Sequence, residues 1–225
     1  MTKLLPISCL CFFAITTANV LAEDAEGVSV IEEIVVTATY RETNLMDTPS
    51  GISAIRDSMI EDLGAQSMED IYTMVPGLSM TGNRAGQNRY TIRGMTSQGG
   101  DIGYAPAGAV VGVYMDGTAV TSALGPDDQL SGTLFDIDRV EILKGPQGTL
   151  FGEGSQSGTI RYLYKQPDLN GFDFAVNASI ADMAESGDLS NRIDAMINNP
   201  ISDSLAIRAT AWRSQTAGYV ENLDP

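Results

Sequence analysis

Residues 134–155 read LFDIDRVEILKGPQGTLFGEGS, in which an apolar run is followed by closely spaced glycines. The run from Val140 to Lys144 predicts a β-strand, because valine, isoleucine and leucine fit a half-buried sheet. Glycine adopts positive φ at little cost, so the region after this strand favours tight turns and close backbone packing. Its glycines are Gly145, Gly148, Gly152, Gly154 and Gly158.

These glycines do not match a nucleotide-binding motif. The stretch contains no G-K-[ST] sequence, and Gly152, Gly154 and Gly158 form G-x-G-x-x-x-G, which is one residue too long for the dinucleotide fingerprint. We therefore expect no phosphate-binding loop here.

Other strand-forming runs flank this stretch on both sides. They lie at 52–55, 90–93, 110–115 and 159–164. Asp116-Gly117 is a turn signal, so residues 110–120 predict a hairpin.

Two short helices are expected between the first and the second of these strands. Ser58-Met-Ile-Glu61 predicts a capping box for a helix that ends at Gly64, and Ser67-Met-Glu-Asp70 predicts another for a helix that stops before Pro76-Gly77. Helices and strands mix without a strict βαβ repeat. We expect an α+β domain with a mixed β-sheet over residues 46–167.

Residues 168–225 alternate between apolar and polar side chains, as antiparallel strands do. Three strands are expected, with a turn over 198–203 before the third and with Trp212 on a polar face. The apolar face would carry Phe172, Phe174, Val176, Ala178, Ile180, Ile193, Ala195, Ile197, Leu205, Ile207, Ala209 and Ala211. Both transmembrane strands and a soluble sandwich fit this alternation.

The first 22 residues resemble a secretory signal peptide, since Lys3 precedes an apolar stretch that ends in small residues. Cleavage is expected before Glu23, and a buried core helix is the alternative. Both cysteines, Cys9 and Cys11, lie in this leader. The mature chain would contain no thiol and no histidine, which excludes disulfides, a Cys/His zinc site and a His general base.

Charge excludes further function classes. Loss of Lys3 leaves 12 basic and 29 acidic residues, a net charge of −17, and such a surface repels nucleic acid. The carboxylates show no paired spacing that argues for acid/base catalysis. We expect neither an enzyme nor a bound cofactor or metal.

Residues 31–38, IEEIVVTA, form a compact β-branched run between an acidic segment, 23–29, and a polar one, 39–49. Two interpretations remain open. The run adds an edge strand to the following domain, or it stays unpaired so that another protein can pair with its backbone.

Five motifs together resemble a known family. They are IEEIVVTA at 31–38, PGLS at 76–79, YTIRG at 90–94, VGVYMDG at 111–117 and the stretch 134–155. The first resembles the TonB box and the others the plug domain of a TonB-dependent outer-membrane receptor. Departures from the family's pattern are Lys144, where arginine is common, and GEGSQSG at 152–158, where GRN-x-x-GG is common.

The resemblance implies a plug domain with a mixed sheet, followed by the first antiparallel strands of a transmembrane β-barrel. Residues 1–22 would be the signal peptide, 23–45 a flexible segment with the TonB box, 46–167 the plug and 168–225 three strands. Closed transporters of this kind have about 22 strands. Three strands would leave an open edge in lipid, so we expect the chain to be a fragment of a longer receptor.

The resemblance also implies a function: active uptake of a scarce nutrient across the outer membrane of a Gram-negative cell. A ferric siderophore is the expected ligand, with carbohydrate or vitamin B12 as alternatives. TonB, energised by the inner-membrane ExbB/ExbD complex, would pair with Glu32, Glu33, Ile34, Val35, Val36, Thr37 and Ala38. Outer-membrane lipid is the other expected partner.

The family's functional positions fall on four further residues. Arg93 and Lys144 correspond to plug cations that face barrel carboxylates, and Arg84 and Gln98 lie in loops that contact ligand in ferrichrome-type receptors. Two other functional classes have different requirements. A signal-transducing receptor would need an additional module before the TonB box, for which eight residues leave no room, whereas a soluble plug-like binding module stays an alternative.

Overall fold

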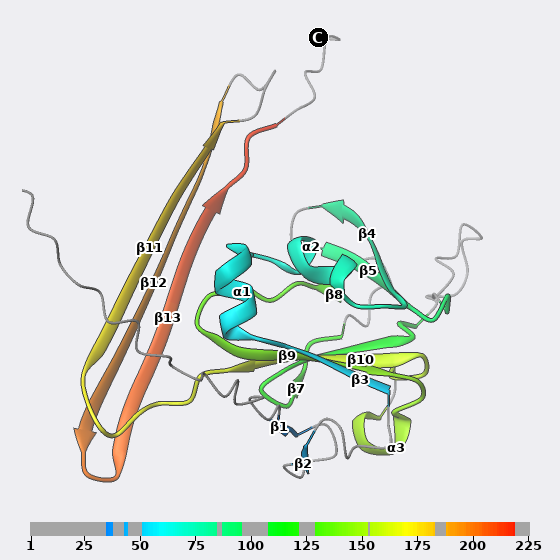
Figure 1. Cartoon of the computed structure of the whole chain (residues 1–225), viewed down its shortest axis with the longest axis horizontal. Coiled ribbons are helices and arrows are strands. Elements are labelled where there is room, and N and C mark those ends of the chain that lie inside the picture. Colours follow the sequence, from blue (N-terminus) through cyan, green and yellow to red (C-terminus); the bar gives the residue numbers. More distant parts are fainter. Residues whose placement is uncertain are drawn as a thin grey trace, which may run out of the picture. The chain divides into compact units, whose positions relative to one another are not determined.

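The structure, a computed structural model, describes residues 35–37, 43–44, 51–84, 87–95, 108–121, 129–152, 154–182 and 188–218. The expected signal peptide, residues 1–22, and residues 23–34 lie outside this set. Figure 1 shows the elements in chain order.

A five-stranded sheet forms the centre of the expected α+β domain, in the order β3-β9-β10-β6-β7. All neighbours are antiparallel except β10 and β6, which run parallel, so the prediction of a mixed sheet is confirmed. Its strands are β3 (Gly51–Arg56), β9 (Ile137–Lys144), β10 (Gly158–Tyr164), β6 (Val111–Met115) and β7 (Thr118–Ala119).

The predicted hairpin joins β6 and β7. Met115 pairs with Thr118, and the two turn residues Asp116 and Gly117 have φ of 44° and 83°. Positive φ at both positions is the type I′ geometry that an Asp-Gly pair favours.

Two helices cover one face of this sheet: α1 (Asp57–Leu63) and α2 (Met68–Ile71), the latter continued by the 3-10 turn η2 (Tyr72–Met74). Ser67 forms the predicted capping box with Asp70, and Gly64 ends α1 in the left-handed conformation. The capping box expected at Ser58 is wrong. The helix already begins at Asp57, whose carboxylate accepts the Ser58 N–H at 2.7 Å.

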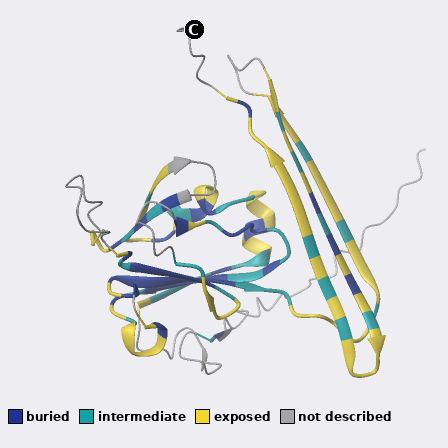
Figure 2. Ribbon diagram, turned by 180° about the vertical axis from the view of Figure 1, so that it is seen from behind, coloured by how far each residue is buried: buried dark blue, intermediate teal, exposed yellow. Residues whose placement is uncertain are grey.

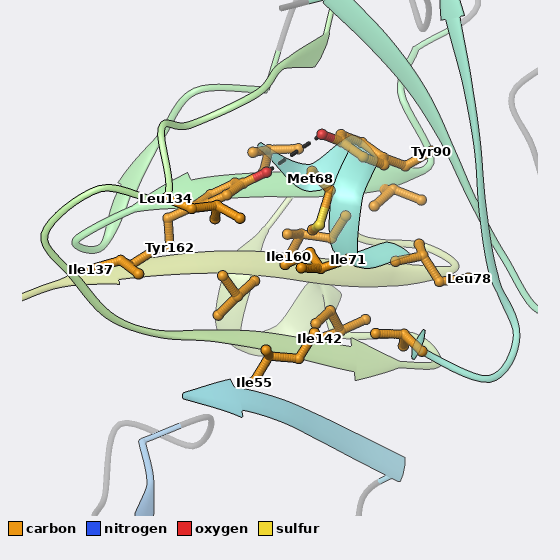
Figure 3. Close-up of a cluster of buried hydrophobic side chains, with 14 of the residues drawn as sticks. Ile55, Met68, Ile71, Leu78, Tyr90, Leu134, Ile137, Ile142, Ile160 and Tyr162 are labelled. Atoms are coloured by element: carbon orange, nitrogen blue, oxygen red, sulfur yellow. Dashed lines mark hydrogen bonds between the residues drawn. The ribbon is translucent and has the colours of Figure 1, made fainter. Parts of the chain in front are cut away.

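A second, three-stranded sheet lies across the helices, in the order β4-β5-β8. Its strands are β4 (Leu78–Arg84), β5 (Gln87–Ile92) and β8 (Gln129–Leu130). The main core forms between these layers, and Figure 3 shows side chains from both sheets and from α2 meeting there. Tyr90 and Tyr162 bring their hydroxyl oxygens to 3.4 Å inside this core.

The glycine-rich stretch makes turns and a short helix, α3 (Gly148–Phe151). Gly152 and Gly154 have positive φ, and a Cβ added at Gly158 would lie 2.4 Å from the Leu143 carbonyl oxygen. The prediction of tight turns and close backbone packing is confirmed.

The C-terminal part forms an antiparallel sheet of its own, β11-β12-β13. These strands are β11 (Asp173–Asp182), β12 (Leu189–Ser202) and β13 (Leu205–Gln215). The predicted alternation is confirmed, since Phe174, Val176 and Ile180 are exposed whereas Asp194, Met196 and Asn198 on the other face are buried. Figure 2 shows this alternation along the strands, in contrast to the continuous buried run in the five-stranded sheet.

The turn expected over 198–203 is wrong, because β12 continues to Ser202 and only two residues separate it from β13. Proline is tolerated at position 200 because the pairing with β11 ends at Asn198, so the backbone nitrogen of Pro200 faces no neighbour there.

Two further short strands, β1 (Val35–Val36) and β2 (Thr43–Asn44), pair antiparallel with each other. Within the described residues no helix has the length and apolar character needed to cross a membrane. The same residues contain no group of three or more side chains of the types that bind metal ions.

Candidate functional site

The face of the five-stranded sheet opposite the helices carries a cluster of charged side chains. Alternation along β9 sends Val140 and Ile142 into the main core and therefore turns Arg139 and Glu141 to the other face. Arg161 of β10 lies directly across from Glu141 in the antiparallel register. We call Arg139, Glu141 and Arg161 the Thr37 site, after the residue that occupies it.

The Thr37 site is held together by ion pairs. Glu141 accepts from Arg139 Nε at 2.8 Å with one carboxylate oxygen and from Arg161 Nη1 at 2.6 Å with the other. Glu141 is fully buried and Arg161 is 5% exposed. Burial of a carboxylate is costly unless it is paired, and the two guanidinium groups meet that requirement. Arg161 also lies over the ring of Phe151, 5.5 Å from its centroid.

Thr37 binds this cluster through both its backbone and its side chain. Its N–H donates to Glu141 Oε1 at 2.9 Å. Its hydroxyl oxygen accepts from Arg139 Nη2 at 3.1 Å and lies 3.4 Å from Arg161 Nη1. The preceding residue, Val36, is fully buried. The end of the 31–38 segment therefore contacts the sheet at one polar and one apolar position.

Of the 31–38 segment the structure describes residues 35–37, in which a short strand is present. Val35 and Val36 pair with Asn44 and Thr43, in a two-stranded sheet separate from the five-stranded one. Glu32, Glu33, Ile34 and Ala38 lie outside the described residues. Of the segment's pairing, the structure describes that of Val35 and Val36.

The expected plug cations Arg93 and Lys144 are brought together. Lys144 pairs with Gly51 across β9 and β3, and a Cβ added at Gly51 would lie 2.8 Å from Arg93 Nη2. Burial lowers the pKa of Lys144, and the positive charge of Arg93 lowers it further. Within the described part of the chain neither cation has an ion-pair partner.

Other contacts join the expected plug domain to β11–β13. Arg208 of β13 pairs with Asp136 through two hydrogen bonds, the one from its Nε being 2.8 Å long. Arg192 of β12 donates to Thr133 Oγ1 at 2.5 Å. These contacts come from the polar face of the strand sheet, where Asp194 also lies, 2.8 Å from Arg192.

Trp212 lies on this polar face, as predicted, and lines two cavities with plug residues. One is shared with Thr133 and Arg192, and the other, of about 380 Å³, with Asp136 and Arg208. A third cavity of about 470 Å³ lies between α1 and the strands.

The expected ligand contacts are not placed by the structure. The backbone of Arg84 ends β4, but its side chain lies outside the described residues, as does the whole of Gln98. Thr37, which occupies the Thr37 site, is a predicted site residue, whereas the three residues that form the site are not. Positions 141 and 161 are charged residues between apolar ones in the predicted strands, and Arg139 directly precedes the first of these strands, which is a usable signal. Their pairing depends on a register that the sequence does not display.

Comparison with known proteins places these features in a family. The model of the TonB-dependent receptor plug domain matches residues 44–159, just over half of the chain. The chain belongs to this plug domain family. The family consists of transport receptors of the outer membrane. The match begins in β2 and ends inside β10.

Two curated relatives and one solved structure illustrate the likeness of this plug-domain chain. The catecholate siderophore receptor Fiu of Escherichia coli is 28% identical over 170 residues, which is 76% of this chain and 20% of that protein. The vitamin B12 transporter BtuB of Vibrio vulnificus is 30% identical over 141 residues, covering 62% and 22%. The ferripyoverdine receptor of Pseudomonas aeruginosa has a TM-score of 0.59 at 22% identity, covering 80% and 22%.

The solved structure shows the fold: a plug domain with a mixed sheet, followed by antiparallel strands that do not close a barrel within this chain. The chain spans about a fifth of the length of the relatives it matches.

Proposed function

We propose that this chain belongs to an outer-membrane receptor that takes up a ferric siderophore, with energy delivered through TonB by the inner-membrane ExbB/ExbD complex. Family membership supports a TonB-dependent transport receptor, and similarity to the catecholate siderophore receptor Fiu supports a siderophore as ligand. A leader at residues 1–22, cleaved before Glu23, would direct export.

The observation that carries the proposal is the state of the TonB box, residues 31–38. Its described strand, Val35–Val36, pairs over two residues with β2 and not with the main sheet. A two-stranded pairing outside a larger sheet is at best marginally stable in water. A partner strand that pairs along the whole segment can therefore replace β2.

Arg93 and Lys144 are proposed as contacts to barrel carboxylates. Their proximity without an ion-pair partner in the described residues supports this role, since a carboxylate from another strand would relieve the repulsion between them. Arg84 and Gln98 stay the proposed ligand contacts on sequence grounds alone.

The experiment is Val35→Pro in the full-length receptor. Proline removes a backbone donor, so we expect energised uptake of a radiolabelled ferric siderophore to be lost while binding to de-energised cells is retained. Val35→Thr is the matched control, because threonine keeps the donor and the β-branched shape. Uptake by the proline variant at the wild-type rate would contradict the proposal.

Vitamin B12 is a second candidate ligand, favoured by the 30% identity to the relative BtuB. Competition separates the two. Cells that carry the receptor are given either a labelled ferric catecholate or labelled cobalamin, each with and without an excess of its unlabelled form. Only the true ligand class binds and is displaced.

A further inference from the structure

Thr37 contacts all three charged side chains of the Thr37 site. Glu141 is fully buried and Arg161 nearly so, although they lie on the sheet face that carries no long helix. Val36 is fully buried at the same place. Residues 36–37 therefore lie against a buried, fully paired set of charges.

The contacts of Thr37 favour a side chain that can accept a hydrogen bond. The carboxylate of Glu141 takes the backbone N–H, which fixes the extended chain at this point. The hydroxyl oxygen accepts from Arg139, with Arg161 on its other side, and arginine offers only donors. A side chain that presents an acceptor is therefore favoured at position 37, and an apolar side chain of the same shape is not.

We propose that Arg139, Glu141 and Arg161 form a polar docking site that holds Thr37, and with it the end of the 31–38 segment, against the plug. The β1–β2 pairing alone holds the segment weakly, since an isolated two-stranded sheet is at best marginally stable in water. The docking site supplies the additional hold. The occupant is this chain's own residues 36–37, seated on the site in the structure.

The site is suited to reversible binding. When Thr37 leaves, both carboxylate oxygens of Glu141 keep an arginine partner, so no buried charge is left unpaired. Water can replace the N–H and the hydroxyl of Thr37.

A consequence for transport rests on the proposed function: the segment must leave the Thr37 site before a partner strand can pair along its whole length. The docking itself does not depend on transport. The two statements therefore need separate measurements.

Hydrogen exchange of the full chain tests the docking. The quantity measured is the protection factor of the amides at positions 36 and 37, that is, exchange relative to the intrinsic rate of an unstructured peptide. Thr37→Val removes the acceptor and keeps the shape, and we expect protection to fall about fivefold, the effect of losing one net hydrogen bond. Thr37→Ser keeps the hydroxyl and should match the wild type.

Glu141→Gln tests the other side of the contact. It should lower the protection of the same amides, while unchanged protection at Val140 and Ile160, within the main core, shows that the plug is folded. If positions 36 and 37 are unprotected in the wild type, or if Thr37→Val matches Thr37→Ser, the docking site does not exist. If protection responds as expected but Val35→Pro still supports uptake, the docking site stands and the proposed function fails.

Discussion

Tyr164, at the end of β10, is a residue whose surroundings affect its ionisation. Its hydroxyl donates to the Thr133 carbonyl oxygen at 3.2 Å, and its N–H donates to Asp116 Oδ1 at 2.9 Å. Burial, with a smaller contribution from the negative charge of Asp116, raises the pKa of Tyr164 from 10.0 to about 12.

This shift predicts a loss of stability in alkali. Between pH 10 and about 12 the folded state keeps a proton on Tyr164 that the unfolded chain has lost, so the free energy of unfolding falls as pH rises through this window. The contribution is fully present below pH 10. Urea unfolding from pH 9 to 11.5 measures it, and Tyr164→Phe should show a shallower decline. Some decline should remain in Tyr164→Phe, because burial also raises the pKa values of Tyr90 and Tyr162. If the free energy of unfolding declined equally with pH in both proteins, the assignment to Tyr164 would be wrong.

Single residues were the hardest level to predict from sequence. Thr37 was expected to pair with a partner protein, yet the structure shows it on Glu141, more than a hundred residues away. Such a contact depends on the register of β9 and β10 and on the path of the chain before β3, neither of which a local pattern encodes.

At the level of elements, Gly158 shows how closely two sheets approach. It begins β10, and a Cβ added to it would lie 2.4 Å from the Leu143 carbonyl oxygen and 2.5 Å from Ile92 Cδ1. Leu143 belongs to the neighbouring strand β9 and Ile92 to the second sheet. The first clash involves backbone, so side-chain rearrangement cannot remove it.

Gly158→Ala should therefore lower the free energy of unfolding by about 1–3 kcal/mol, the usual cost of overpacking. Gly148→Ala is the matched control, because a Cβ there meets nothing within 4 Å and Gly148 lies in α3. Alanine in a helix is favourable, so the control should change stability by less than about 1 kcal/mol. Urea denaturation compares the two variants, and equal stability would show that β10 can move away from β9.

The elements themselves were largely predictable, because strand alternation and glycine turns are local signals. The failures have local causes too. Ser58 had the spacing of a capping box, but Asp57 begins the helix one residue earlier. The polar strand β4 was missed, since LSMTGNR has little apolar alternation and gains its order by pairing with β5.

At the scale of the whole molecule, the sequence predicted a plug domain followed by barrel strands, and the family match confirms that fold. It did not predict how the plug and the β11–β13 sheet contact each other. Asp136 and Arg208 are 72 residues apart and come from a turn and a strand. Their pairing follows from the tertiary arrangement, and no motif marks it.

The Asp136–Arg208 pair should be a main link between the plug and the strand sheet. Its side chains are 6% and 11% exposed, so removing one partner leaves a nearly buried charge, at a cost of about 3 kcal/mol. Asp136→Asn makes the change with little backbone strain, because asparagine tolerates the φ of 59° at this position. Trp212, the chain's only tryptophan, lines the cavity beside the pair, and its fluorescence during urea unfolding in detergent reports the loss.

Asp57→Asn provides the control, since the pair of Asp57 with Lys165 is of the same kind but more exposed, at 38% and 34%. An exposed pair contributes about 0–1 kcal/mol, so the control should unfold close to the wild type. The comparison isolates burial as the cause, because both variants remove one carboxylate charge that faces a cation. Equal destabilisation by the two variants would mean that the link between plug and strands lies elsewhere, with Arg192 and Thr133 as the next pair to test.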